Sequence, residues 1–418
     1  MGHIQSIVEN LGVAHQPRWP DHEVAWPPAP DHNEVVRIEE QRRVTRELLE
    51  MLQGSRPNGV GQPFEHGVDA YVSRSFAELE ERLIFAQQPQ MVALSCELAE
   101  PGAVLTDEVG PAPVVVVRGR DGVARAFLNV CRHRSAPVEL ERCATRHSLM
   151  CPYHGWTYGL DGELRAISDP GGFEGLEPGD RGLVQLPVLE IGGMIFVHPQ
   201  PGGAFEEDGR SELAEQLGGY GLETLHRWRS EEFTYDFNWK LGLETFHETY
   251  HFAWLHATTV GTLLHGNRSH YTGWGRHHRM AIPRRSIDAL AEQHEDDWVP
   301  LDHLVVVQQV FPNSLVIWLK DHVETWRAYP DPTDPGRCRI RLTLFTPTAP
   351  ADEREEAHWE LNWKLTMDTV DNEDFRLAAG IQRGMASGAQ DAVVYGSNEP
   401  ALQHFARTIR HAVGQSSA

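Results

Sequence analysis

Two short segments, Cys131-x-His133 and Cys151-x2-His154, constrain the fold of this chain more than any other feature. Each segment offers one thiolate and one imidazole, and both groups are common metal ligands. The residues between His133 and Cys151 are sufficient for a pair of strands that brings both segments to one point. The sequence therefore predicts a small β structure that carries two ligand loops.

The mixture of ligands indicates an iron–sulfur cluster. Two Cys and two His form the ligand set of a Rieske centre, in which the Cys hold one iron and the His hold the other. The flanking residues agree with this ligand set, since Arg134 follows the first His and Pro152-Tyr153 and Gly155-Trp156 surround the second. Small and rigid residues in such loops let backbone amides point at the cluster sulfurs. A structural zinc site is the alternative, but zinc motifs usually pair Cys with Cys and His with His.

Composition narrows the class of protein further. With 37 basic and 60 acidic residues among 418, the net charge is −23, which argues against nucleic acid as a partner. No apolar run approaches the ~20 residues that span a bilayer, so we expect no membrane segment and a cytoplasmic location. The remaining cysteines, Cys96, Cys143 and Cys338, are most simply free thiols in a reducing compartment.

The pattern along the chain predicts an α+β protein with four parts. Residues 1–65 form an N-terminal helical arm, with a Pro-rich stretch and a helix near 38–53. Residues 66–200 form the small β domain, residues 201–230 a helical linker, and residues 231–418 a second domain. In the first β domain we expect strands at 114–117, 124–129, 148–151 and 195–198. In the second domain we expect strands at 231–237, 303–319, 322–329 and 338–346, and helices at 239–256, 352–380 and 398–413.

A second group of candidate ligands lies on the expected helix 239–256. Asn238 is a good N-cap for it. Glu244, Glu248 and His251 have the spacing of one helical face, and nearby aromatic residues suggest that the helix is buried. His251 and His256 are five residues apart, which does not keep both on one face. We therefore expect the helix to loosen or end between them, so that both imidazoles converge.

The same segment contains a competing motif. Residues 247–251 read His-Glu-Thr-Tyr-His, the zincin pattern, in which two His bind zinc and the Glu acts as a general base. The motif is short, and nothing downstream has the extended metzincin spacing. We take His247 as a packed or hydrogen-bonded side chain, with a spare metal ligand as the alternative.

Taken together, these motifs resemble the terminal oxygenase (α) subunits of the Rieske non-heme iron oxygenases, also called ring-hydroxylating oxygenases. The resemblance covers about residues 66–415 and rests on the two Cys/His loops, Asn238-Trp239-Lys240 and the segment up to His256, in this order. It implies a Rieske [2Fe–2S] domain, a small β-sandwich, and a helix-grip-like catalytic domain in which helices flank an antiparallel sheet. It also implies a mononuclear Fe(II) that is held by two His and one carboxylate.

The resemblance assigns roles to particular residues. Cys131, His133, Cys151 and His154 become the cluster ligands, and His251 and His256 become iron ligands. The carboxylate ligand would be Asp374, with Asp371 as the alternative, in the acidic segment before Gln382-Arg383-Gly384. Asn238 and Glu248 would support catalysis. Glu248 would bridge His251 to His154 of a neighbouring subunit, since such outer hydrogen bonds orient metal-bound imidazoles.

Two positions depart from the family pattern. Ser135 stands where members commonly have Gly, which puts the turn and the cluster potential in question. The bridging residue is Glu248 rather than Asp, as in members that act on quaternary ammonium compounds and in some that act on aromatic acids.

The resemblance also implies partners. A separate NAD(P)H-dependent reductase, with or without a ferredoxin, would supply electrons to the cluster and then to the iron, where O2 is activated. The chain has no Gly-rich dinucleotide fingerprint, so the nicotinamide would bind the partner. A homotrimer is implied, to which a small β subunit could be added.

The expected reaction is hydroxylation of a small organic, aromatic substrate, by dihydroxylation or monooxygenation. Quaternary ammonium oxidation and N- or O-demethylation are the alternatives within the family, and a zinc-stabilised binding protein is the alternative from another class. A pure electron carrier would not need the second domain. We expect the substrate pocket under the sheet, lined by Phe311, Leu315, Ile317, Trp318, Trp326 and Tyr329.

Overall fold

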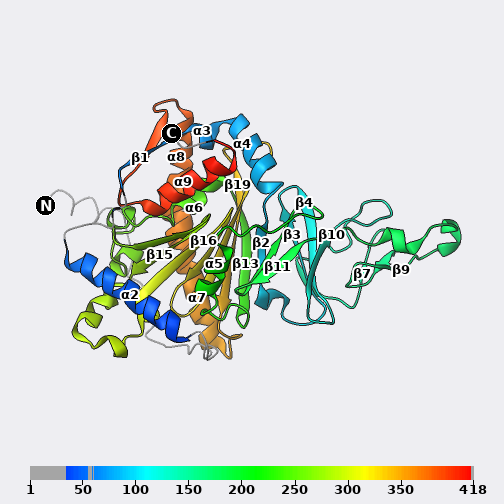
Figure 1. The fold of residues 1–418 in the computed structure, drawn as a ribbon, viewed down its shortest axis with the longest axis horizontal. Coiled ribbons are helices and arrows are strands. Elements are labelled where there is room, and N and C mark those ends of the chain that lie inside the picture. The colour runs from blue at the N-terminus through cyan, green and yellow to red at the C-terminus, as the bar shows by residue number, and fades with distance from the viewer. Residues whose placement is uncertain (1–33, 55–58, 60, 416–418) are drawn as a thin grey trace.

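The computed structural model describes residues 34–54, 59 and 61–415. It has a broad body from which a narrower part projects (Figure 1). This projecting part is called the arm from here on and is distinct from the N-terminal helical arm expected at residues 1–65. The body contains the large sheet and most of the helices, whereas strands β3 to β11 lie toward or within the arm (Figure 1). The expected Pro-rich stretch lies outside the described residues. Within the described residues, no helix is both long enough and apolar enough to cross a membrane.

Three small antiparallel sheets make up the arm and its base. Their strand orders are β10-β5-β4-β3-β6, β11-β12-β2 and β7-β8-β9. Valines at 114–117 are all fully buried because β4 packs on both faces, which is why its sequence is continuously apolar rather than alternating. The bounds are β2 Gln90–Leu94, β3 Ala103–Val109, β4 Ala112–Arg118, β5 Ala124–Leu128, β6 Cys143–Thr145, β7 Leu149–Met150, β8 Thr157–Tyr158, β9 Leu164–Ala166, β10 Gln185–Leu186, β11 Val188–Ile191 and β12 Met194–Val197.

A seven-stranded antiparallel sheet forms the centre of the body, in the order β13-β19-β18-β17-β16-β15-β14. Its central strands β16 and β17 are buried along their whole length, and β18 is buried up to its last residue, because helices and loops cover both faces. The bounds are β13 His226–Tyr235, β14 His270–Trp274, β15 His277–Pro283, β16 Leu304–Val310, β17 Ser314–Trp318, β18 Val323–Pro330 and β19 Cys338–Thr346. A separate pair joins β1 Phe64–Gly67 to β20 Ala392–Tyr395.

The helices of the body cover this sheet (Figure 1). The long C-terminal helical run supplies Trp359, Trp363 and Phe375 to the main core, and α9 adds Phe405 and Ile409. The bounds are α2 Glu34–Gln53, α3 Asp69–Val72, α4 Arg74–Glu80, α5 Arg210–Leu217, α6 Trp239–Glu244, α7 Glu353–Thr366, α8 Arg376–Ala386 and α9 Pro400–Ala412, with π-helical segments η2 Glu81–Phe85 and η11 Met367–Phe375.

Short 3-10 helices complete the connections between these elements. Three of them, η8 to η10, occupy the long connection between β15 and β16, and η6 and η7 lie in the segment after α6. Their bounds are η3 Ser95–Leu98, η4 Pro170–Phe173, η5 Pro178–Arg181, η6 His251–Ala253, η7 Val260–Thr262, η8 Arg285–Glu292, η9 Glu295–Asp297 and η10 Pro300–His303.

The fold class expected from the sequence is confirmed, but several boundaries are wrong. The expected strand 303–319 is two strands, β16 and β17, because the chain turns at Phe311-Pro312. The expected helix 239–256 ends at Glu244, and the helical linker 201–230 contains only α5 before β13 begins at His226. The sequence reading also missed β14 and β15, which form one edge of the sheet.

Candidate metal centres

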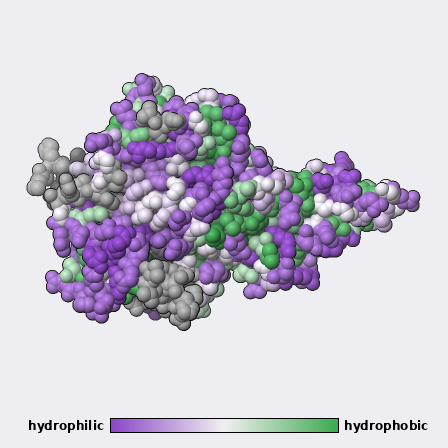
Figure 2. Space-filling model, viewed as in Figure 1, coloured by the Kyte–Doolittle hydropathy of each residue, from purple (hydrophilic) through white to green (hydrophobic). Residues whose placement is uncertain are grey.

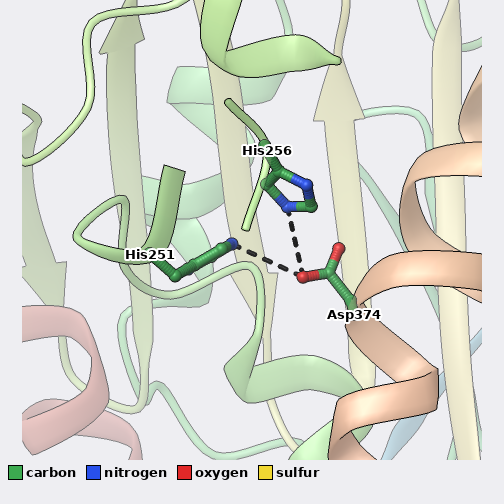
Figure 3. A group of neighbouring side chains, drawn as sticks. All are labelled: His251, His256 and Asp374. Atoms are coloured by element: carbon green, nitrogen blue, oxygen red, sulfur yellow. Dashed lines mark ion pairs between the residues drawn. The ribbon is translucent and has the colours of Figure 1, made fainter. Parts of the chain in front are cut away.

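Three side chains from separate segments converge in the body. His251 begins the short 3-10 helix η6, His256 follows it, and Asp374 comes from η11. Their donor atoms all lie within 4.8 Å of one another. Asp374 Oδ1 is 3.5 Å from His251 Nε2 and 3.2 Å from His256 Nε2, and the three side chains face a common point (Figure 3). Two imidazoles and one carboxylate on one side of an ion leave other positions open.

The early end of α6 is what allows the two imidazoles to converge. Asn238 caps the helix by accepting a hydrogen bond from the Lys240 amide, but the helix stops after six residues. The chain then folds tightly on itself, and the carbonyl of His256 accepts hydrogen bonds from the amides of Thr259 and Gly261. A Cβ at Gly261 would lie 2.5 Å from that carbonyl oxygen, so only glycine fits there.

An outer carboxylate contacts each imidazole. His251 Nδ1 hydrogen-bonds Glu248 Oε1, and His256 Nδ1 is 2.6 Å from Glu373 Oε2, which also accepts from Thr259 Oγ1 at 2.8 Å. These contacts hold both rings with Nε2 toward Asp374. Burial lowers the pKa of His256, but Asp374 and Glu373 outweigh burial and raise that pKa. The sequence had predicted no role for Glu373 or Thr259. The only signal for Glu373 was its place in the acidic segment that contains Asp374.

The structure separates the two candidate carboxylates of η11. Asp374 lies with the histidines, whereas Asp371 Oδ1 accepts a hydrogen bond from Tyr235 Oη at 2.9 Å. Burial raises the pKa of that Tyr235 hydroxyl, and the Asp371 contact adds to the increase. The donor set found around the point in Figure 3 is therefore His251, His256 and Asp374, without Asp371.

Three other expected residues lie apart from this group. His247 Nε2 is 3.0 Å from Gln309 Oε1 and burial lowers its pKa to about 3, so it is a buried, hydrogen-bonded side chain and does not converge with His251. The expectation that Glu244 shares a helical face with Glu248 and His251 is wrong, because α6 ends at Glu244. The Asn238 side-chain amide donates to the carbonyls of Pro335 and Tyr71, so the structure gives it a capping role apart from His251, His256 and Asp374.

The two Cys/His loops have closely similar backbone turns. The amide of Ser135 donates to Cys131 O, and the amide of Gly155 donates to Cys151 O. Ser135 and Gly155 both adopt a left-handed conformation, with φ of 60° and 69°. This conformation costs a non-glycine residue about 1 kcal/mol or more, so Ser135 preserves the turn at some cost in stability.

The side chains of these loops fit an iron–sulfur cluster. Cys131 and Cys151 are buried, and the rings of His133 and His154 lie 4.7 Å apart between centroids. The His133 ring stacks on Trp156, and its buried Nδ1 has no hydrogen-bond partner among the residues that the structure describes. Tyr158 Oη lies 3.3 Å from Cys131 Sγ. A buried nitrogen without a partner is costly unless it binds a ligand, so two thiolates and two imidazoles are left for a cluster.

A cavity enclosing about 880 Å³, including its open mouth, lies beside the His251, His256 and Asp374 group. Its wall is mostly apolar and combines the face of the sheet with one side of α7 and η11. The residues that line it include Phe246, Phe252, Val260, Leu263, Leu264, Ile282, Arg284, Val305, Val307, Ile317, Leu319, His322, Glu324, Thr366, Thr369 and Val370.

The expected lining was correct at only one of its six positions, Ile317. Strand residues alternate between faces, so Trp318 points to the opposite face and packs against Tyr220. Tyr329 lies at Asp107, toward the arm. The others, Phe311, Leu315 and Trp326, are core residues that do not reach the cavity.

Two family models match the chain over the regions that contain these sites. The Rieske [2Fe-2S] domain matches residues 88–177, and the ring-hydroxylating α subunit catalytic domain matches residues 222–415. Both motifs on which the resemblance rested lie inside these matches. The chain belongs to the Rieske-type ring-hydroxylating oxygenase α subunits.

Curated relatives are similar over part of their length. The glycine betaine monooxygenase oxygenase subunit of Chromohalobacter salexigens is 33% identical over 223 residues, which is 53% of this chain and 48% of that protein. The carnitine monooxygenase oxygenase subunit of Acinetobacter pittii is 32% identical over 186 residues, which is 43% of this chain and 49% of that protein. The aligned part of this chain thus spans about half the length of these relatives.

Solved structures share the fold. The quaternary ammonium Rieske monooxygenase CntA, in complex with L-carnitine, aligns with a TM-score of 0.70 at 21% identity and covers 85% of this chain and 96% of that one. Naphthalene 1,2-dioxygenase from Rhodococcus sp., bound to indole, aligns with a TM-score of 0.64 at 17% identity, covering 90% and 98%. At these identities the likeness concerns the fold.

Proposed function

We propose that this chain is the terminal oxygenase component of a Rieske system and hydroxylates a small organic substrate. His251, His256 and Asp374 would hold a mononuclear iron, and Cys131, His133, Cys151 and His154 would hold the [2Fe–2S] cluster. The observation that carries the proposal is the convergence of three donor atoms within 4.8 Å at the wall of the large apolar cavity. Iron in such a site activates O2 when electrons are supplied.

The surrounding residues prepare this site for its ligands. Glu248 and Glu373 accept hydrogen bonds from the two Nδ1 atoms, which fixes the tautomer that leaves each Nε2 free to bind a metal. The Phe252, Val260 and Leu264 side chains line the cavity and limit the access of water. A substrate that lies between these side chains and the donor set would present a carbon atom to the open positions.

The cavity favours a substrate with an apolar body. Ten of the residues that line it are aliphatic, and the two phenylalanines among the lining residues are Phe246 and Phe252. Quaternary ammonium groups are usually held by cages of several aromatic rings, with Trp and Tyr the strongest partners. A quaternary ammonium substrate is the second candidate, favoured by the names of the relatives from Chromohalobacter and Acinetobacter.

We further propose a homotrimer in which the cluster of one subunit serves the iron of the next. Strands β7 and β9 lie in the outer part of the arm, apart from the sheet of the body (Figure 1), and the loop with Cys151 and His154 follows β7 directly. Exposed apolar side chains occur at both places: Met150 and Tyr153 at the arm, and Tyr250 and Trp254 beside His251. Figure 2 also shows hydrophobic residues along the arm. When two different surfaces of identical chains contact each other, the subunits form a closed ring if the rotation from one subunit to the next returns to the first. Electrons would come from a separate NAD(P)H-dependent reductase, with or without a ferredoxin.

The test of the iron sites combines EPR of the dithionite-reduced protein with an iron count. We expect a Rieske signal and about three irons per chain, two in the cluster and one in the mononuclear site. His251→Ala should lower the count to about two and keep the signal, because the cluster loops lie elsewhere in the chain. His247→Gln is the matched control and should keep all three. Zinc in place of iron, with no Rieske signal, would refute the proposal.

Light scattering tests the trimer. Trp254 is 80% exposed, and a charge placed there would be buried in the proposed contact. Trp254→Glu should therefore shift the mass from trimer to monomer. Val394→Glu, a similar change at an exposed residue on β20, should leave the mass unchanged. A wild-type protein that is monomeric at micromolar concentration would rule out the assembly.

A further inference from the structure

One wall of the large cavity is a face of the helical run formed by α7 and η11. Residues three or four positions apart share one side of a helix, and this run lines the cavity in that pattern. The six residues that line it are Asn362, Leu365, Thr366, Thr369, Val370 and Asp374. A substrate that lies against this wall would therefore meet polar groups at fixed heights along the helix.

Three of the four polar residues on this wall already have a use. The Asn362 side-chain amide donates to a backbone carbonyl on the preceding turn of α7 at 3.1 Å. Thr366 Oγ1 donates to Glu324 Oε1 at 2.6 Å. Asp374 belongs to the group of candidate metal ligands. The fourth polar residue is Thr369.

The Thr369 hydroxyl is buried without a hydrogen bond. The residue is 5% exposed, and its Oγ1 has no hydrogen-bond partner among the residues that the structure describes. A threonine in a helix often turns its hydroxyl to a carbonyl of the preceding turn, which Thr369 does not do. A buried hydroxyl without a partner is costly. Because Thr369 lines the cavity, this hydroxyl is left for a molecule that occupies the cavity.

Thr369 lies one helical turn before Asp374. Both residues belong to the π-helical segment η11, in which hydrogen bonds join residues five positions apart. Asp374 projects from this segment toward the two histidines (Figure 3). One turn corresponds to on the order of 5 Å along the helix axis. A substrate atom bound to Thr369 would therefore lie a few bonds from an atom that faces the metal ligands.

The charged residues at the other end of the cavity are balanced. His322 Nδ1 lies 2.7 Å from Asp321 Oδ1, and His322 Nε2 lies 3.6 Å from Glu324 Oε1. Burial lowers the pKa of His322, but Asp321 and Glu324 outweigh burial and raise it to about 9. The two carboxylates thus offset the positive charges of His322 and Arg284. Neither sign of charge is in excess, so this end does not favour an ionic ligand.

From this arrangement we propose that the Thr369 hydroxyl donates a hydrogen bond to an uncharged oxygen of the substrate, a few bonds from the carbon that is oxidised. The substrate would then be an apolar, uncharged molecule with a carbonyl or ether oxygen near the reacting carbon. Such an oxygen enters an apolar cavity at a lower desolvation cost than an ion does. This inference rests on the proposed oxygenase function and specifies its substrate class, with Thr369 as a specificity-determining residue.

Calorimetry on the anaerobically purified holoprotein tests the inference with acetophenone and α-methylstyrene. These ligands have the same shape and differ in having C=O or C=CH2. Thr369→Val replaces the hydroxyl with a methyl group, so it should weaken binding of the ketone about threefold to tenfold, the effect of one neutral hydrogen bond. Binding of the alkene should stay within about twofold, which also shows that the variant is folded. Thr369→Ser keeps the hydroxyl and should bind the ketone as the wild type does.

Thermal unfolding without ligand supplies a second readout and a matched control. Thr366→Val should lower the melting temperature because it removes a donor from the buried Glu324 carboxylate. Thr369→Val should not lower it, because no described protein group loses a partner. A similar loss of stability in both variants would assign the Thr369 hydroxyl a structural role and overturn the inference.

Two binding results would also overturn the inference. These are equal changes in affinity for the ketone and the alkene in Thr369→Val, and no measurable binding of the ketone to the wild type. Because heat is measured and not turnover, both results leave the Rieske signal and the iron count intact. The loss of that signal and of the iron would instead refute the oxygenase function itself.

Discussion

At the scale of single residues, the type of a side chain indicates whether it can bind a metal. The choice between two such residues that are close in sequence depends on where each side chain points in the folded protein. Cys and His in two matching loops indicate a cluster whatever the details of the turn. Asp371 and Asp374 are equally good carboxylates in sequence. Only the course of η11 turns Asp374 toward the two histidines and Asp371 toward Tyr235.

Paired variants should separate these two carboxylates. Asp374→Asn should lower the iron count by about one per chain and abolish turnover, because an amide is a much poorer ligand than a carboxylate. Asp371→Asn should retain the iron, since the Asp371 side chain accepts a hydrogen bond from Tyr235 and lies outside the His251, His256 and Asp374 group. Iron analysis and activity assays decide the matter, and iron loss in the Asp371 variant alone would reverse the assignment.

At the scale of elements, the helices differ from the expected ones in the segments that carry the candidate metal ligands. The segment 239–256 has helical periodicity, yet α6 ends at Glu244 and the chain loosens to present both imidazoles. The helical run from α7 to α8 contains the π-helical segment η11 at the position of Asp374. Such π-helical segments are frequent at functional sites, because the extra residue per turn redirects a side chain.

The end of α6 buries a carboxylate whose titration should be visible in stability. Burial raises the pKa of Glu244 to about 7, although hydrogen bonding by Tyr71 and the charge of Lys240 oppose the shift. The folded protein therefore holds a proton that the unfolded chain releases near pH 4.5. The stabilisation is present below pH 4.5 and is lost as pH rises through 7.

Glu244→Gln should remove this pH dependence while keeping an acceptor for the Tyr71 hydroxyl. Between pH 5.5 and 8.5 the wild type should lose roughly 1–3 kcal/mol more stability than the variant. Denaturant unfolding at both pH values measures the difference. Glu78→Gln on the exposed face of α4 should behave like the wild type, and parallel pH profiles for wild type and Glu244→Gln would refute the prediction.

At the scale of the whole molecule, one buried carboxylate joins the arm to the body. Asp107 on β3 lies 2.7 Å from Arg327 and 2.9 Å from Arg341, which belong to β18 and β19 of the large sheet. Tyr329 Oη also donates to it. Burial would raise the pKa of Asp107, but the arginines outweigh burial and hold that pKa well below its usual range. These ion pairs and this hydrogen bond hold the arm against the large sheet of the body.

Asp107→Ala should destabilise the protein by about 3–5 kcal/mol, because it leaves Arg327 buried without its carboxylate. We expect the variant to unfold in two separate calorimetric transitions, as the arm loses its connection to the body. Its neighbour Glu108 forms an exposed ion pair with Arg339, so Glu108→Ala should cost under about 1 kcal/mol. A single transition at the wild-type temperature in Asp107→Ala would contradict this role.

The sequence by itself determined the class of fold, the two Cys/His loops and the histidine pair, because these depend on residue type, spacing and local periodicity. The family resemblance limited the candidates for a third metal ligand to two carboxylates, Asp371 and Asp374. The tertiary structure decided everything that depends on direction across long separations in sequence. It brought Glu373 to His256 and gave the cavity a lining that differs from the expected one at five of six positions. The physical reason is that a strand presents alternate faces and a helix turns with each residue, so an error of one residue or one boundary moves a side chain from the cavity into the core.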